Sequence, residues 1–240
     1  MLRSTWFHEL HNNACAKPFL FPERYAQYRQ WAHQKLMRYI KVKQPILDDV
    51  DRFFSTYLQG YTCIGVHVRY CKAHGKEVPG GRVPELQEYY QEIDKIMSQL
   101  DASKVKIYVA SDSHYAINKF KQHYPDKIVC LEGAFRDAYR NDPHLIDNDT
   151  YYWLAHPEEF HAKKPGYKGG KEALMDCLLL SKCSYLLHTA SNFATFAMLF
   201  NSHVKTIVLP KTMQTTSCWL LEPERAHDRA LIKNQWHLDL

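Results

Sequence analysis

The amino-acid sequence predicts an α/β protein in which helices cover a doubly wound, Rossmann-like parallel sheet. From Cys63 onward, short runs of apolar and β-branched residues alternate with longer segments whose apolar residues recur at helical spacing. Strands separated by helices favour parallel pairing, because each connection must cross over the sheet before the next strand begins. The residues before Cys63 show helical spacing only, so an N-terminal helical segment is also predicted.

Residues 1–60 are expected to form this helical packing segment. An aromatic-rich helix is predicted over 22–40, and Pro45 stands at the predicted start of a second helix. Proline is tolerated there because the first amides of a helix need no acceptor within it. We expect both helices to pack against the larger domain, residues 61–240.

The larger domain is predicted to contain five strands and four connecting helices. The strands are expected at 63–69, 105–110, 127–131, 184–188 and 204–209, and the helices at 86–100, 114–124, 171–183 and 192–201. Residues 132–170 are too many for an ordinary connection and are predicted to form a long insert. The histidines of this insert, His144, His156 and His161, lack the spacing of a zinc-binding helix, so we expect no metal site.

Composition and charge argue against several classes of protein. The net charge of +5 and the pI near 8.7 come without a dense run of Lys and Arg, which argues against nucleic-acid binding. No apolar stretch is long enough to span a membrane. The seven cysteines are scattered, and those in apolar segments, Cys63, Cys130 and Cys177, are expected to be buried free thiols. We therefore expect a cytoplasmic protein, or one of the secretory-pathway lumen if the sequence is part of a longer protein.

Polar residues follow three of the predicted strands, at the edge where open α/β sheets bind ligands. His67 and Arg69 end the first strand, Asp112 and Ser113 follow the second, and 188–192 follows the fourth. The serines and the aspartate also have a purely structural interpretation, because Ser and Asp commonly cap the first turn of a helix.

Arg69 is the strongest of these candidates for ligand binding. A guanidinium at the end of a buried strand is costly unless it meets an anion, and its planar fork suits a pyrophosphate. An internal carboxylate partner is the alternative. His67 shares a sheet face with Arg69, and either assists the same ligand or is a core histidine. Gly169 and Gly170 either present amides to a phosphate or form a loop that needs glycine.

Three segments form an ordered set of motifs. They are IGVHVR at 64–69, followed by Gly75 and Glu77; VASD at 109–112; and LMD, LSKC and TASN at 174–176, 180–183 and 189–192. In this order they resemble the conserved motifs of the α1,6-fucosyltransferases, a family that includes the rhizobial nodulation enzymes and the animal core fucosyltransferase. The resemblance covers residues 64–201.

The resemblance implies a GT-B fold, of which this chain would be the C-terminal, donor-binding half. It implies that GDP-fucose is the donor and that fucose is transferred with inversion to a glycan or other hydroxyl acceptor. It also implies that no metal or cofactor is required.

Carried over residue by residue, the resemblance gives roles to six side chains. Arg69 would bind the β-phosphate and His67 would help to hold the nucleotide. Asp112 would lie near the donor, and Asp176 would contact the guanine or ribose end. Glu77 would be the general base, since an inverting transfer needs a carboxylate to take the acceptor proton. The phosphate would also be bound by Ser191, with Asn192 beside it.

The sequence departs from the family pattern beside two of these residues. Arg69 stands where the family has two consecutive arginines, and Lys72 or Lys76 is expected to supply the missing cation. Asn192 stands where the family has a second serine. These departures bear on which acceptor is used and which linkage is formed more than on which donor is bound.

Two other functions are compatible with the sequence. One is a glycosyltransferase of the same fold that uses another nucleotide sugar, and the other is an inert GDP-binding or interaction module. Only two helical segments precede the first predicted strand. We therefore expect that half of the GT-B cleft is missing from these 240 residues and comes from an N-terminal domain or a partner chain.

Overall fold

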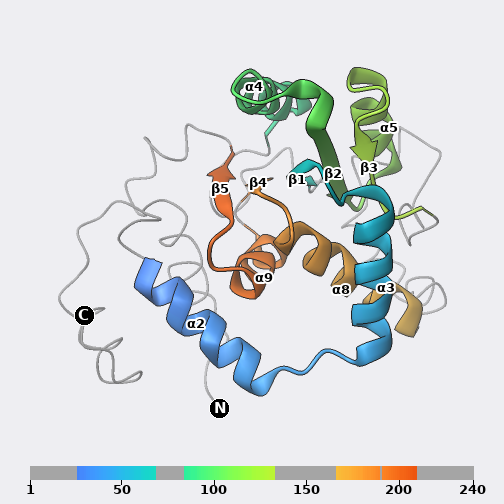
Figure 1. Cartoon of the computed structure of the whole chain (residues 1–240). Coiled ribbons are helices and arrows are strands. Elements are labelled where there is room, and N and C mark those ends of the chain that lie inside the picture. The colour runs from blue at the N-terminus through green and yellow to red at the C-terminus, as the bar shows by residue number, and fades with distance from the viewer. Residues whose placement is uncertain (1–25, 69–83, 133–165, 190, 210–240) are drawn as a thin grey trace, which may run out of the picture.

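The chain forms a five-stranded parallel sheet with the strand order β3-β2-β1-β4-β5 (Figure 1). The computed structural model describes residues 26–68, 84–132, 166–189 and 191–209. The strands are β1 (Thr62–Val68), β2 (Val105–Ser111), β3 (Ile128–Val129), β4 (Tyr185–His188) and β5 (Lys205–Val208). The first strand lies at the centre and later strands are added outward on both sides, which confirms the predicted doubly wound sheet.

Helices cover both faces of this sheet. They are α2 (Ala26–Tyr39), α3 (Gln44–Tyr57), α4 (Leu86–Met97), η2 (Ala102–Lys104), α5 (His114–His123), α8 (Gly166–Ser181) and α9 (Asn192–Phe200). Figure 1 shows α4 and α5 on one face, and α3, α8 and α9 on the other. Helix α2 packs against α9 on the second face.

Local sequence signals explain where several helices begin. Pro45 lies in the first turn of α3, as predicted. Helix α4 begins with a capping box in which the side chains of Glu85 and Glu88 each accept a hydrogen bond from the other's backbone amide. Helix α5 begins at Ser113, whose Oγ accepts a hydrogen bond from the backbone amide of Ala116 at 3.3 Å. The structural interpretation of Ser113 as an N-cap is therefore confirmed.

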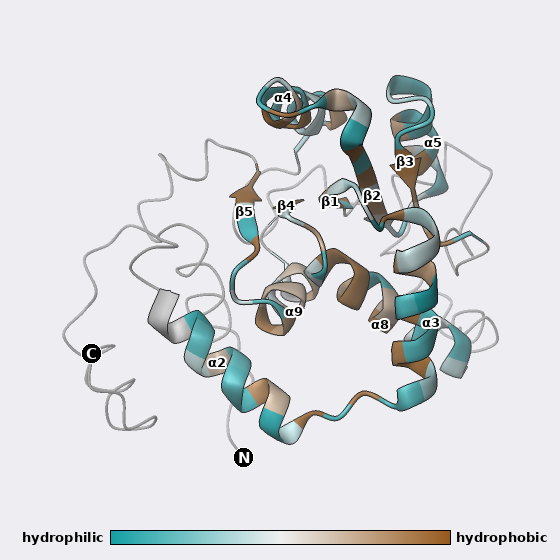
Figure 2. Cartoon of the chain, viewed as in Figure 1, coloured by the Kyte–Doolittle hydropathy of each residue, from teal (hydrophilic) through white to brown (hydrophobic). Residues whose placement is uncertain are grey.

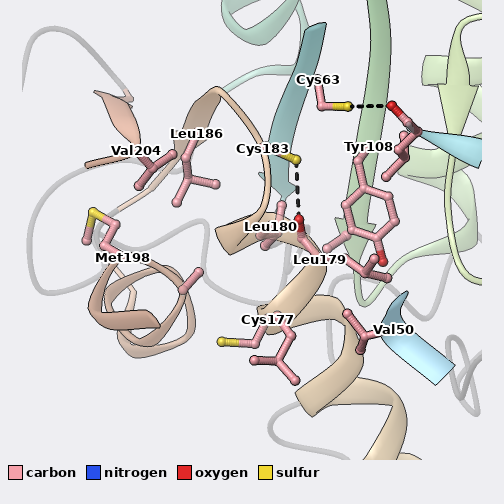
Figure 3. Packing of buried hydrophobic residues seen from close by; sticks show 14 of the residues in the cluster. Val50, Cys63, Tyr108, Cys177, Leu179, Leu180, Cys183, Leu186, Met198 and Val204 are labelled. Atoms are coloured by element: carbon pink, nitrogen blue, oxygen red, sulfur yellow. Dashed lines mark hydrogen bonds between the residues drawn. The ribbon is translucent and has the colours of Figure 1, made fainter. Parts of the chain in front are cut away.

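The core consists of one apolar cluster on each face of the sheet. On the α4 and α5 face the fully buried members include Ile64, Tyr89, Ile93, Ile107 and Phe120. On the other face they include Leu58, Tyr108, Leu179, Leu180 and Leu186, part of which is drawn in Figure 3. Figure 2 shows hydrophobic residues along β2 and in the part of α8 nearest the sheet. The side chains of β1 are buried from Cys63 to Val68, as expected for a central strand.

Gly65 allows α8 to lie close to the central strand. A methyl group added at this position would be 3.1 Å from both Cys183 Sγ and Leu180 Cδ2, which are themselves buried. These distances are shorter than ordinary van der Waals contacts, so a larger side chain would push α8 away from β1. The glycine of the first motif thus has a packing role.

Four cysteines of the described residues are buried free thiols: Cys63, Cys130, Cys177 and Cys183. Burial raises the pKa of Cys63 to about 11. It raises the pKa of Cys177 to about 12, with a further contribution from the charge of Asp176. Thiolates are the reactive form, so these thiols are expected to be inert in the folded protein. The prediction of buried free thiols is confirmed for the three cysteines for which it was made.

The N-terminal helices are attached to the sheet domain by specific polar contacts. In α2, the Arg29 guanidinium donates to the Val204 carbonyl at 3.1 Å, and His33 Nδ1 donates to the Leu199 carbonyl at 2.7 Å. In α3, Asp49 forms an ion pair with Lys171 of α8. Ile46 and Val50 of α3 also belong to the apolar cluster on the face of the sheet that α8 and α9 cover. Helix α3 therefore contributes to the core.

Some boundaries differ from the prediction. Helix α8 begins at Gly166, so Gly169 and Gly170 lie inside a helix and neither precede its N-terminus nor form a loop, and both interpretations offered for them are wrong. Strand β3 spans two residues, whereas five were predicted. Most of the predicted insert at 132–170 lies outside the described residues.

Among the residues that are described, no helix is long and apolar enough to cross a membrane.

Candidate functional site

The candidate site lies at the carboxyl ends of β1 and β4. From β1 the chain leads to α4 on one face of the sheet, and from β4 it leads to α9 on the opposite face. The point where consecutive connections leave on opposite faces is the switch point of the sheet, and this is where doubly wound sheets bind ligands. The two strands pair up to His67 and His188, so both histidines lie at this switch point.

His67 is held on several sides. Only 8% of its surface is exposed. Its ring stacks on Phe193 of α9, with 4.9 Å between the ring centroids and an angle of 20° between the planes. Its Nδ1 lies 3.3 Å from the hydroxyl of Ser191, and its carbonyl accepts a hydrogen bond from Tyr89 at 3.4 Å. The structure thus brings together His67 and Ser191, two predicted site residues that are 124 residues apart in the sequence.

Ser191 also caps α9. Its Oγ accepts a hydrogen bond from the backbone amide of Ala194 at 3.1 Å. The structural interpretation of Ser191 as an N-cap is therefore confirmed, and the contact with His67 exists beside it. Asn192 is the first residue of the same helix. The positive end of the α9 dipole accordingly lies next to His67, which favours a negatively charged ligand.

Asp112 directly follows β2, the strand that pairs with β1 on the side away from β4. Its side chain is exposed, and its charge contributes, after burial and the charge of Glu88, to raising the pKa of Tyr89 well above the ordinary range. Tyr89 is the residue that donates to the His67 carbonyl. Asp112 therefore lies on the α4 side of the candidate site.

Asp176 has a different environment. It lies in α8, is 9% exposed and accepts a hydrogen bond from the hydroxyl of Tyr108, a fully buried residue of β2. The next residue, Cys177, contacts the Phe193 carbonyl, which links this part of α8 to the residue that stacks on His67. Tyr108 was not among the site residues predicted from the sequence. The only signal was a tyrosine inside an apolar strand, since a buried tyrosine hydroxyl usually finds a polar partner.

Replacing Tyr108 with phenylalanine should lower the free energy of unfolding by about 1.5 to 3 kcal/mol, because it removes a buried hydrogen bond to a carboxylate. Urea denaturation followed by circular dichroism measures the change. Tyr61→Phe is the control, because Tyr61 is exposed in the turn before β1 and should change stability by less than about 0.5 kcal/mol. Equal stability of the two variants would show that the contact with Asp176 contributes nothing.

The polar end of β4 is more deeply buried than its sequence suggests. His188 is fully buried and its Nδ1 donates to the carbonyl of Thr189 at 2.7 Å. Burial lowers its pKa to about 4, opposed by the hydrogen bond to Thr189 and assisted by the positive charge of Arg29. His188 is therefore neutral at physiological pH. Arg29, which the sequence analysis also did not identify, is itself buried, and burial lowers the pKa of its guanidinium.

The remaining predicted site residues, Arg69, Lys72 and Glu77, together with Lys76 and Gly75, lie at 69–83, outside the described residues. Arg69 directly follows Val68, the last residue of β1 in the structure. In the part of the chain that the structure describes, no group of three or more His, Cys, Asp or Glu side chains is arranged to hold a metal ion.

The chain is similar to proteins of known family. The family model of nodulation protein Z (NodZ) matches residues 27–221. Nodulation protein Z of Bradyrhizobium diazoefficiens is 24% identical in an alignment of 184 residues that covers 73% of this chain and 44% of that protein. Nodulation protein Z of Sinorhizobium fredii is 23% identical in an alignment of 181 residues that covers 70% of this chain and 48% of that protein. A crystal structure of NodZ α1,6-fucosyltransferase soaked with GDP-fucose aligns with a TM-score of 0.43 and 19% identity, over 70% of this chain and 45% of that chain.

The chain thus spans about half the length of the curated relatives that it matches. The family model matches most of its 240 residues, and it covers all three motifs on which the resemblance to α1,6-fucosyltransferases was based. The chain therefore belongs to the nodulation protein Z family.

Proposed function

We propose that this chain is the donor-binding half of a GDP-fucose-dependent fucosyltransferase, with the donor at the carboxyl ends of β1 and β4. Membership of the nodulation protein Z family supports this, together with the GDP-fucose soaked into a NodZ α1,6-fucosyltransferase crystal. The observation that carries the location is the contact between His67 and Ser191. It joins the first and third motifs at the switch point of the sheet, where nucleotide ligands bind in this class of fold.

In this proposal the donor diphosphate lies between β1 and the start of α9. Arg69 and one of two lysines, Lys72 or Lys76, neutralise the phosphate oxygens, as a guanidinium fork and an ammonium group can. His67, Ser191 and Asn192 bind the same part of the nucleotide. The other end is bound by Asp176 at the guanine or ribose, and Asp112 lies beside the donor on the α4 side.

The chemistry would be an inverting displacement. Glu77 would take the proton from the acceptor hydroxyl as the oxygen attacks the anomeric carbon of fucose from the side opposite the diphosphate. The bond between that carbon and the phosphate oxygen breaks, and the negative charge that develops on the leaving GDP is stabilised by Arg69 and the amides at the start of α9. Cationic side chains would fill the role that a metal ion has in other transferases.

The acceptor side is proposed to lie on another part of the protein. The chain spans about half the length of its curated relatives in the family. A GT-B active site lies in the cleft between two domains, so a further domain or a partner chain would complete it and hold the glycan acceptor. Orienting that acceptor can contribute up to about 7 to 11 kcal/mol, so donor binding is expected to be less dependent on the second domain than transfer is.

A nucleotide panel tests the proposal. GDP and GDP-fucose should raise the melting temperature of the chain, since a ligand at about 100 times its Kd stabilises the folded state by about 2.7 kcal/mol. UDP, ADP and their sugars should have little effect, and EDTA should leave the GDP response unchanged. Preference for UDP or ADP would favour a transferase with another donor. GDP binding without transfer of fucose to any acceptor would favour an inert module if it persisted once the further domain or partner chain was present. No response to any nucleotide would overturn donor binding.

A further inference from the structure

The Ser191 hydroxyl has two partners, and they come from different parts of the fold. Its oxygen accepts a hydrogen bond from the Ala194 amide in α9 at 3.1 Å. It also lies 3.3 Å from Nδ1 of His67 at the end of β1. Among the described residues, the Ser191 hydroxyl has no other hydrogen-bond partner.

These two contacts determine where the hydroxyl proton points. The amide of Ala194 can only donate, so the serine oxygen accepts on that side. Nδ1 of His67 is then the one remaining acceptor, within the described part of the chain, for the proton of the hydroxyl. A neutral imidazole that accepts at Nδ1 carries its own proton on Nε2. The opposite arrangement would have Nδ1 donate to a serine oxygen that already accepts from Ala194, and the hydroxyl proton would have no acceptor.

The ring of His67 is also fixed in orientation. Phe193 stacks on one side at a centroid distance of 4.9 Å, and it belongs to the same first turn of α9 as the cap. The backbone of His67 is held by pairing with Ala110 and His188 on the two neighbouring strands, and by Tyr89 at its carbonyl. A ring held in this way has few alternative orientations, so the contact between Nδ1 and the Ser191 hydroxyl is maintained.

We propose that Ser191 is a positioning residue that holds His67 as the neutral tautomer with its proton on Nε2. His67 would then offer a hydrogen-bond donor to a phosphate oxygen, whereas the other tautomer would offer a lone pair and repel it. The identity of the ligand in this inference rests on the proposed function. The start of α9 and the end of β1 would thereby be coupled through a single hydroxyl.

The tautomer of His67 is measured directly in the ¹⁵N-labelled chain without nucleotide, by two-bond ¹⁵N–¹H correlation at a pH where the imidazole is neutral. We expect Nε2 to be protonated in the unaltered protein. Ser191→Gly should give a mixture with the Nδ1-protonated form, because glycine is a good N-cap but has no hydroxyl. Ser191→Thr retains a hydroxyl and should retain the tautomer. Ser113→Gly is the matched control, because it removes the corresponding cap of α5 and should leave His67 unaffected.

Three results would overturn the inference: Nδ1 protonated in the unaltered protein, an unchanged tautomer in Ser191→Gly, or an equal change in Ser113→Gly. The tautomer of the unaltered protein is measured without any variant, so the inference can be overturned even if Ser191→Gly does not fold. A GDP titration separates this inference from the proposed function. Ser191→Gly should weaken GDP binding several-fold to about tenfold, the effect of one hydrogen bond. The expected tautomer in a chain that binds no GDP would refute the proposed ligand and leave the positioning role supported.

Discussion

Glu77→Gln should slow fucose transfer by about 10² to 10⁴ while leaving GDP affinity nearly intact, because a general base contributes to the rate and glutamine cannot accept the proton. GDP release from GDP-fucose measures the rate, with chitooligosaccharide or N-glycan acceptors and with water. Following the reaction over hours detects slow turnover of these 240 residues alone, and calorimetry measures GDP affinity.

The control is Glu132→Gln, an exposed carboxylate that pairs with Lys121 near the edge strand β3 and should change neither quantity. Two results would contradict the role of Glu77. Near-normal GDP release with normal GDP affinity would exclude it as the base. A loss of GDP affinity as large as the loss of rate would indicate that Glu77 orders the binding segment and takes no proton.

The fold could be predicted from the sequence because its strands are short, apolar and separated by helices with clear periodicity. Central strand β1 is buried from Cys63 to Val68, so its apolar run is continuous and unmistakable. The weakest strand, β3, has two residues with partly exposed side chains, and its apolar run says little about where pairing with β2 ends. Boundaries follow from hydrogen bonding in the folded state, which a local pattern does not contain.

The start of α8 could not be predicted for a related reason. Gly169 and Gly170 have low helix propensity and argued for a loop, each at a cost of about 1 kcal/mol relative to alanine. Helix α8 includes them nevertheless. The apolar residues that follow, such as Leu179 and Leu180, are completely buried. Burial of each such side chain contributes about 1.5 to 3 kcal/mol, which exceeds the cost of two glycines.

The edge of the sheet at which the candidate site lies could be predicted from the sequence, but the contacts between its side chains could not. Open sheets bind ligands at their carboxyl edge, so His67 and Ser191 could be named from the sequence. The contact of Ser191 with His67, and the stacking of Phe193 on the same ring, depend on how β1 and β4 are aligned. The two contacting residues are separated by 124 positions in the sequence. Tyr108 and Asp176 meet in the same way, through the packing of α8 on β2. Such pairs are set by tertiary packing, and a single sequence carries no record of it.

Arg69→Ala should weaken GDP binding by several-fold to several hundredfold with the fold retained, since a charge-assisted hydrogen bond contributes about 1.5 to 3 kcal/mol. In the sequence, Arg69 directly follows Val68, the last residue of β1, and is two residues from His67. In the proposed site, removing the only arginine of the first motif would leave the diphosphate to one lysine, the residues His67, Ser191 and Asn192, and the helix amides. Titration calorimetry measures the affinity, and circular dichroism checks the fold.

Two further variants test whether GDP affinity depends on the charge of Arg69, on its planar fork or on the net charge of the protein. Arg69→Lys keeps the positive charge but loses the planar fork, so it should recover only part of the lost affinity if two phosphate oxygens are bound together. Arg52→Ala, on the exposed side of α3 where Arg52 pairs with Asp49, is the matched control and should bind GDP normally. Unchanged GDP affinity in a folded Arg69→Ala chain would remove Arg69 from the donor site. An equal loss in Arg52→Ala would show that the effect is one of net charge, which the salt dependence of binding would then confirm.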